Sequence, residues 1–166
     1  AAGVSSSFIH IANHALIKGG LFMAVGSFVA ALGSRANMNS FVGIGRRMPI
    51  TASAFMLCGL SLAGLPLTAG FISKLYLIRA ILSADAYLIA VLVLLSSALS
   101  LIYLWKIVEV MWMQPAPAKS PQLVENPAIY LPLWIVALSN IWFGVDASWL
   151  VSASRAAAAA LIGGGL

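Results

Sequence analysis

The sequence predicts an all-α integral membrane protein with about four transmembrane helices, one of them discontinuous. The chain of 166 residues is 62% hydrophobic and only 8% charged, whereas soluble domains carry about 25% charged residues. Its apolar residues gather in long runs, and short segments with Gly, Pro and charged side chains separate these runs. Runs of about 20 apolar residues can cross a bilayer as helices. Because no linker divides the chain, we expect one transmembrane domain over residues 1–166.

The first two apolar runs differ in length and in their content of helix-breaking residues. The run 5–32 is long enough to cross the bilayer with some tilt. The run 50–83 is too long for a simple span, and LAGLPLTAGF within it contains Gly and Pro residues that weaken a helix. We therefore expect a break near 65–70, which leaves either a hairpin of two short helices or one tilted, discontinuous helix.

Two further spans are predicted over 86–113 and 128–150, with Tyr and Trp side chains that are typical of membrane interfaces. The Pro-rich segment 114–127 between them has no helical period and predicts a loop. After residue 150, the Ala-rich tail could continue as a helix, while its terminal Gly run should fray.

The net charge of +5 reflects basic residues that gather in predicted loops and in the tail: Arg35, Arg46, Arg47, Lys119 and Arg155. If 50–83 crosses once, the basic loops 34–48 and 114–127 fall on the same side, which favours the discontinuous helix. The positive-inside rule then places both loops in the cytoplasm and the C-terminus outside, in a membrane such as the bacterial inner membrane. This charge pattern is typical of membrane-protein loops and does not indicate nucleic-acid binding.

HIANHALIK, residues 10–18, places His10, His14 and Lys18 at intervals of four, which keeps them on roughly one face of a helix. A charge at the bilayer centre costs about 2.5–3.5 kcal/mol on insertion scales, so such side chains usually face a protein interior or a water-filled path. Because histidine and buried lysine can exchange protons near neutral pH, the row favours a proton relay. The alternatives are hydrogen bonds to neighbouring helices and a metal or haem site, which would want a further ligand.

Lys74 follows the predicted break and is a further candidate for proton transfer, because interrupted helices form ion sites at mid-membrane. A lysine that merely lies near an interface is the alternative. Lys106 and Glu109 form an i, i+3 pair that is either an interfacial ion pair or a modulator of proton exit. Arg79 could extend to the interface or pair with a partner helix, and we include it as a possible modulator.

Two sequence patterns resemble a known family. HIANHALIKGGLFMAVG contains H-x3-H-x3-K-x2-LF, and GLPLTAGFISK contains GLP-x3-GF-x-SK. In this order and at this separation they resemble the antiporter-like membrane subunits shared by respiratory complex I and Mrp-type cation/proton antiporters. VLVLLSSALSLIYLWKIVE and WFGVD look most similar to the D subunit of the Mrp type. The resemblance covers most of residues 5–150.

The resemblance implies a larger fold of about 14 transmembrane helices in two inverted repeats, with a central axis of charged residues and water. It matches Lys74 to the lysine at the broken helix of the second repeat. It matches His10, His14 and Lys18 to the residues that link the half-channels. The glutamate and paired lysine of the first repeat have no counterpart here, and the chain begins with Ala. The chain therefore resembles the C-terminal third of such a subunit.

The sequence thus predicts part of a proton-translocating subunit of an Mrp-type antiporter, which exchanges Na⁺ or K⁺ for protons. An antiporter-like subunit of an NADH:quinone oxidoreductase of the complex I type is the main alternative, and a purely structural membrane subunit is another. In either assembly the expected partners are other membrane subunits, protons, a coupling cation and the lipid bilayer, without nucleic acid. We expect no cofactor and no redox chemistry in this chain, because it contains no nucleotide, flavin or iron–sulfur motif.

Overall fold

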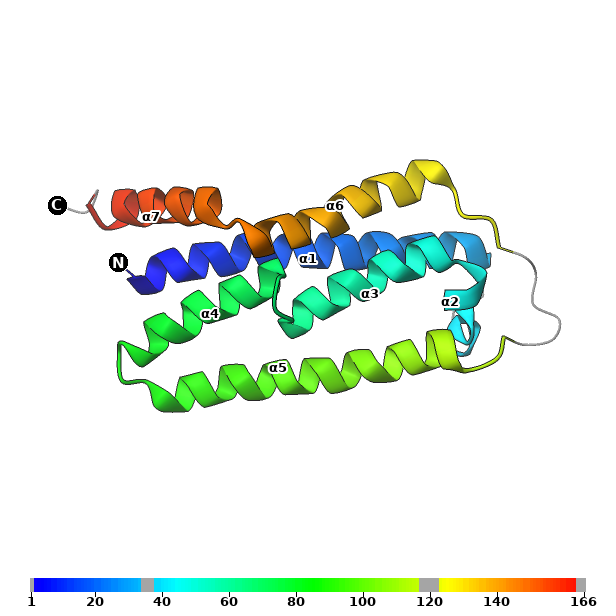
Figure 1. Cartoon of the computed structure of the whole chain (residues 1–166), viewed down its shortest axis with the longest axis horizontal. Coiled ribbons are helices and arrows are strands. Elements are labelled where there is room, and N and C mark those ends of the chain that lie inside the picture. Colours follow the sequence, from blue (N-terminus) through cyan, green and yellow to red (C-terminus); the bar gives the residue numbers. More distant parts are fainter. Residues whose placement is uncertain (1, 34–37, 117–122, 164–166) are drawn as a thin grey trace.

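The computed structural model describes residues 2–33, 38–116 and 123–163, which form a bundle of helices without any strand in these ranges (Figure 1). In chain order the helical elements are α1 (Ala2–Leu32), η2 (Met38–Phe41), α2 (Ile44–Arg47), α3 (Pro49–Ala63), α4 (Ala69–Leu82), α5 (Tyr87–Val108), the π-helical turn η3 (Glu109–Met113), α6 (Pro127–Val145) and α7 (Ser148–Gly163). The predicted all-α fold class is therefore confirmed.

The long helix α1 is the centre of the bundle, and α3, α4, α6 and α7 pack against it. Its buried residues recur every three or four positions and include several small side chains: Ser6, Ile9, Asn13, Ile17, Gly20, Ala24, Ser27 and Phe28. Small residues in such a stripe let neighbouring helices approach closely where no hydrophobic effect drives helices together in lipid. α5 packs on the outside, against α3 and α4.

Three helical stretches in the described ranges are long and apolar enough to cross a membrane: Ala2–Leu32, Tyr87–Met113 and Pro127–Val145. α3 and α4 are individually too short for this, but they follow one another in the same direction along α1 (Figure 1). This arrangement confirms the single, discontinuous helix expected over 50–83. The break lies where the Gly and Pro residues predict it, with Gly64 in the left-handed region (φ 90°) that L side chains rarely adopt.

The two basic loops lie at the same end of the bundle, as the single crossing predicts. η2, α2 and the residues directly after η3 lie at one end, whereas the α4–α5 turn, the start of α1 and the end of α7 lie at the other (Figure 1). Arg46 Nε donates a hydrogen bond to the Trp112 carbonyl (3.0 Å), which joins α2 to η3 at this end of the bundle. Arg35 and Lys119 lie outside the described residues.

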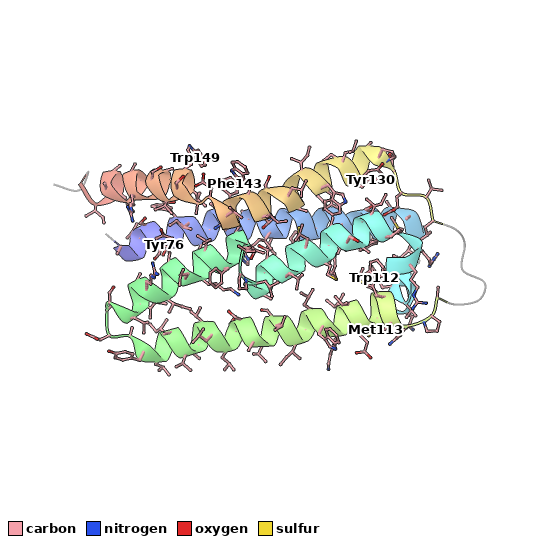
Figure 2. The ribbon with its side chains drawn as sticks, viewed as in Figure 1. Tyr76, Trp112, Met113, Tyr130, Phe143 and Trp149 are labelled. Atoms are coloured by element: carbon pink, nitrogen blue, oxygen red, sulfur yellow. The ribbon has the colours of Figure 1, made fainter. Side chains whose placement is uncertain are left out.

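The fourth predicted span is wrong at its C-terminal end, because a second interruption divides it. α6 ends at Val145, and α7 begins at Ser148. The Asp146 carboxylate accepts hydrogen bonds from the Ser148 backbone N–H (3.0 Å) and from the Ser148 hydroxyl, which starts a new helix. The rings of Phe143 and Trp149 lie on either side of this junction (Figure 2), with their centroids 6.5 Å apart. The helix expected in the Ala-rich tail is confirmed as α7, and the terminal residues 164–166 are outside the described ranges.

We predict that Gly70→Ala destabilises the protein by about 1–3 kcal/mol, because overpacking of a close contact forces the backbone to shift. A Cβ atom at Gly70 would collide with the carbonyl oxygen of Ser61 across the break. Gly26→Ala is the matched control, since a Cβ atom there meets nothing within 4 Å. Thermal unfolding of the full-length protein in detergent should show a lower midpoint for Gly70→Ala alone. Equal midpoints for the two variants would contradict the packing described here.

Candidate functional site

The candidate site is built around the break between α3 and α4. A broken helix exposes backbone N–H and C=O groups, and each unsatisfied group in a bilayer costs several kcal/mol. The Gly70 N–H donates to Ser61 Oγ (3.2 Å), and Ser61 Oγ donates to Asn140 Oδ1 on α6 (3.1 Å). Asn13 Nδ2 on α1 donates to the Ala69 carbonyl (2.9 Å). These buried polar side chains fix the start of α4 against two other helices.

Lys74 satisfies the opposite side of the break. Its Nζ donates to the carbonyl oxygens of Leu62 (2.8 Å) and Ala63 (3.0 Å), which are the last carbonyls of α3. The C-terminal end of a helix carries partial negative charge, so it favours an ammonium group. The side chain of Lys74 is half-buried. The predicted proximity of Lys74 to the break is thus observed as a direct contact with the free helix end.

His10 reaches the same break from α1. Its Nδ1 lies 3.2 Å from Ser73 Oγ, and Ser73 Oγ lies 3.0 Å from the Gly70 carbonyl oxygen. A hydroxyl has one hydrogen to donate. It can therefore donate to Gly70 and accept from a protonated Nδ1, or turn and donate to an unprotonated Nδ1. The rings of His10 and His14 are neighbours, with 5.6 Å between their centroids.

A cavity of about 140 Å³ connects these groups. It is lined by side chains of α1, α4 and α5 together with the break: His10, His14, Ile17, Leu62, Gly70, Ser73, Lys74, Ser96 and Ser100. A polar cavity holds a water molecule when it offers about 10–15 Å³ for the water centre and two or more hydrogen-bonding partners. The cavity is therefore large and polar enough for several water molecules between the histidines and Lys74.

Lys18 does not line this cavity, although the sequence pattern placed it on roughly the same helix face as His10 and His14. Four residues turn an α-helix by about 40° more than one full turn, so a row at intervals of four drifts steadily around the helix. After two such steps Lys18 faces away from α4. Its side chain is exposed, and its Nζ lies 6.0 Å from the centroid of the equally exposed Phe22 ring. His10 and His14 therefore line the cavity and Lys18 does not, and the proton-transfer role expected of Lys18 stays a prediction.

The three possible modulators lie apart from the cavity. Lys106 and Glu109 are both exposed, and no ion pair joins these two described residues. The ion-pair alternative is not observed between these two exposed side chains, because exposed pairs gain little free energy from holding two long side chains together. The modulating role stays a prediction. Lys106 lines a different, largely apolar cavity of about 370 Å³ between α1, α3 and α5. Arg79 lies in the last turn of α4, beside a third cavity.

Several site residues were missed by the sequence analysis: Asn13, Ser61, Ser73, Ser96, Ser100 and Asn140. Asn13 and Asn140 carried a usable signal, because an amide side chain inside an apolar span usually needs a partner in the protein. The serines carried no such signal, since a serine in a transmembrane helix can bond to its own backbone, as Ser97 and Ser139 do. Within 2–33, 38–116 and 123–163, no three His, Cys, Asp or Glu side chains gather as metal ligands.

Comparison with known proteins identifies the family. Residues 1–100 match the family model described as "NADH:quinone oxidoreductase/Mrp antiporter, TM". NADH-quinone oxidoreductase subunit N 1 of Solibacter usitatus is 34% identical over 161 residues, which are 96% of this chain and 33% of that protein. The D subunit of the Na(+)/H(+) antiporter of Bacillus subtilis is 27% identical over 150 residues, which are 90% of this chain and 30% of that protein. The chain thus spans about a third of the length of these two relatives.

A solved structure shares the fold. A chain in the structure of the Mrp complex from Dietzia sp. superposes with a TM-score of 0.82 at 23% identity, over 95% of this chain and 38% of that chain. The oxidoreductase relative has a higher identity than the antiporter relative, so the matches do not specifically favour the expected similarity to the D subunit of the Mrp type. Both kinds of relative fall within the family that the two sequence patterns indicated, and the chain belongs to the NADH:quinone oxidoreductase/Mrp antiporter transmembrane family.

Proposed function

We propose that this chain carries part of a proton path through a membrane subunit, with Lys74, His10 and His14 as the proton-transfer groups. One observation carries the proposal. The Lys74 ammonium lies on the free carbonyls of a broken helix and faces a polar cavity that also contains both histidines. A lysine with only a structural role would not need titratable partners across a cavity of this size.

The geometry supports a relay in which Lys74 alternates between two environments. A protonated Lys74 is held by the Leu62 and Ala63 carbonyls. When it releases its proton, the neutral amine binds these carbonyls less strongly, because hydrogen bonds from a charged donor are about twice as strong. The released proton can pass through water in the cavity to an imidazole nitrogen. Ser73 can change its hydrogen-bond direction as His10 changes its protonation.

Lys18 is proposed as the next group on this path, in the direction of segments that this chain does not contain. Its exposed position beside Phe22 cannot face lipid without a large cost in free energy. Since the chain spans about a third of its relatives' length, a further part of the same protein can cover this face. The contact would extend the polar path from the cavity beyond α1.

The path is proposed to work in a multi-subunit membrane assembly of one of two kinds. The relatives are named as a subunit of an NADH-quinone oxidoreductase and as a subunit of an Na(+)/H(+) antiporter. In the first kind proton movement would be coupled to redox chemistry in other subunits, and in the second to Na⁺ or K⁺ transport. Following the positive-inside rule, we propose that the end with Arg46 and Arg47 faces the cytoplasm, in a bacterial inner membrane.

We predict that Lys74→Met in the full-length protein lowers proton flux at least about tenfold, since general acid–base groups typically contribute about 10²–10⁴-fold. Flux is measured in proteoliposomes with a pH-sensitive dye. Lys106→Met is measured in parallel and should lower the flux far less, because Lys106 is exposed and lies outside the cavity, so that it can at most modulate the path. A native gel checks that both variants still assemble. Normal flux with Lys74→Met would exclude the proposed role, and normal flux with altered assembly would indicate a purely structural subunit.

We further predict that Ser73→Ala lowers proton flux by about 2- to 12-fold, which corresponds to the loss of one hydrogen bond of about 0.5–1.5 kcal/mol. The variant removes the partner of His10 Nδ1 without removing a titratable group. Ser7→Ala serves as its control, because the Ser7 hydroxyl is exposed and bonds only to the Gly3 carbonyl of its own helix. The same proteoliposome assay applies. If both serine variants transport equally well, His10 is not oriented by Ser73 during transport.

A further inference from the structure

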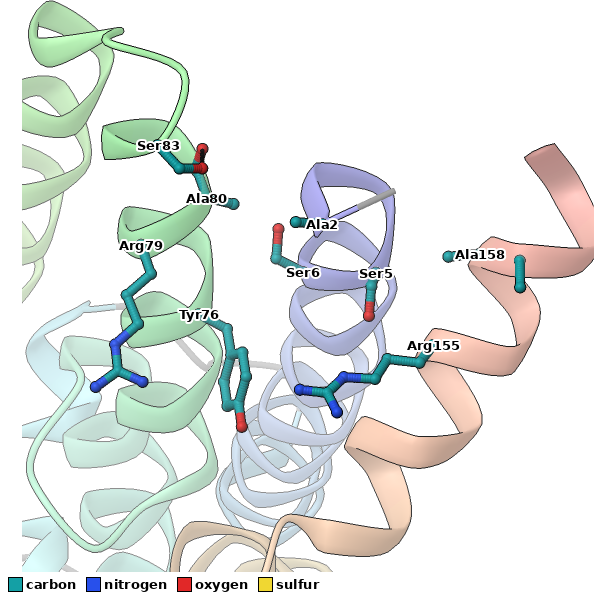
Figure 3. Close-up of a pocket in the computed structure, with 10 residues that line it drawn as sticks. Ala2, Ser5, Ser6, Tyr76, Arg79, Ala80, Ser83, Arg155 and Ala158 are labelled. Carbon is teal, nitrogen blue, oxygen red and sulfur yellow. Dashed lines mark hydrogen bonds between the residues drawn. The ribbon is translucent and has the colours of Figure 1, made fainter.

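The third cavity, beside Arg79, lies at the end of the bundle where α4 turns into α5. It has a volume of about 430 Å³ and opens between α1, α4 and α7. Its lining combines two arginines, one tyrosine, three serines and small alanines: Ala2, Ser5, Ser6, Tyr76, Arg79, Ala80, Ser83, Arg155, Ala158 and Ala159. Figure 3 shows Tyr76 between α4 and α1, and Arg155 reaching from α7 toward α1. This cavity shares no lining residue with the one around Lys74.

Arg79 and Arg155 both line this cavity and are exposed, and Figure 3 shows the Tyr76 ring between them, with Arg79 turned away from Arg155. Neither arginine has an acidic partner within the described part of the chain. The whole sequence contains four Asp and Glu residues. Asp85 bonds to the Tyr87 hydroxyl, Glu125 accepts from the Ile50 and Thr51 backbone, and Asp146 accepts from Ser148. The fourth, Glu109, begins η3 at the opposite end of α5. Each carboxylate therefore lies elsewhere, and the counter-charge for Arg79 and Arg155 must come from outside the described residues.

The chemistry of the lining selects an anion that also has an apolar part. Arginine presents a planar set of N–H donors that matches phosphate and carboxylate oxygens in a bidentate way. Hydroxyl groups of Tyr76 and Ser5 border the same space and can donate further hydrogen bonds. Beside them, Ala158 and Ala159 form a smooth apolar wall, and the exposed alanines of α7 continue it. A phosphate group attached to hydrocarbon fits both parts of this lining.

The position of the cavity in the fold agrees with such a ligand. Arg79 lies in the last turn of α4, next to the turn that leads to α5, and therefore close to one end of the membrane-spanning bundle. Lipid phosphates lie at this level of a bilayer, where a basic side chain can contact an anionic headgroup. We propose that the cavity between α1, α4 and α7 binds the phosphate group of an anionic phospholipid through Arg79 and Arg155.

The proposal is tested by native mass spectrometry on the full-length protein after delipidation in detergent. Phosphatidylglycerol is added to the wild type and to the double variant Arg79→Gln/Arg155→Gln. Each basic side chain near an anionic headgroup contributes about 1 kcal/mol, so the double variant should bind the lipid about 10- to 30-fold more weakly. Arg79→Lys/Arg155→Lys keeps the charge and should lose far less affinity. Lys106→Gln removes one exposed positive charge elsewhere and should bind as the wild type does.

Parallel measurements separate the possible sources of the anion. Inorganic phosphate added to the same samples should compete only weakly, because it lacks the apolar part that contacts α7. Loss of phosphate binding in the double variant with unchanged lipid binding would overturn the lipid assignment. Unchanged lipid binding with loss of a neighbouring subunit on a native gel would also overturn it, in favour of an acidic side chain from a partner. Because the readout is binding, the result does not depend on the proton path proposed above.

Discussion

The rest of the structure depends on how the backbone groups freed between α3 and α4 are satisfied. No water is available in a hydrocarbon layer, so these groups need partners from the protein. On the α4 side, Ser61 accepts from the Gly70 N–H and donates to Asn140, and Asn13 donates to the Ala69 carbonyl. Lys74 binds the carbonyls at the end of α3. These contacts reach from α3 and α4 to α1 and α6. The interruption is therefore also the point at which four helices are fixed relative to one another.

The proposed proton path would give Lys74 a chemical role in addition to its structural one. The ammonium group binds the α3 carbonyls more strongly than the neutral amine does. Protonation of Lys74 and its contact with the end of α3 are therefore thermodynamically linked. The contacts of Ser61, Asn140 and Asn13 on the α4 side contain no titratable group, since Asn and Ser side chains keep their charge state. A change in the protonation of Lys74 should therefore affect one side of the break while the other stays fixed. Such an asymmetry is what a local proton-dependent movement requires.

The sequence was sufficient to predict the helical class, the single interrupted crossing and three of the groups at the site. The Gly and Pro residues near the break and the ionisable side chains in apolar runs are strong local signals. The spacing of Lys18 did not predict that it lies outside the cavity. A pattern read at intervals of four ignores the drift of about 40° per step around a real helix. The partners Ser61 and Ser73 could not be predicted, since only the packing of distant helices decides whether a serine bonds across a break or to its own backbone.

The segment between α3 and α4 packs against α6 close to the second interruption, which the sequence did not predict. Leu67 adopts a left-handed conformation (φ 69°) that costs an L residue about 1–2 kcal/mol. Gly144 on α6 lies so close to the Leu67 carbonyl and to Thr68 that a Cβ atom there would collide with their backbone. α6 ends one residue later, at Val145. The Asp146 carboxylate then accepts a hydrogen bond from the Ser148 N–H at the start of α7. The strained connection of α3 to α4 thus packs directly against α6 at Gly144, because this position has no side chain.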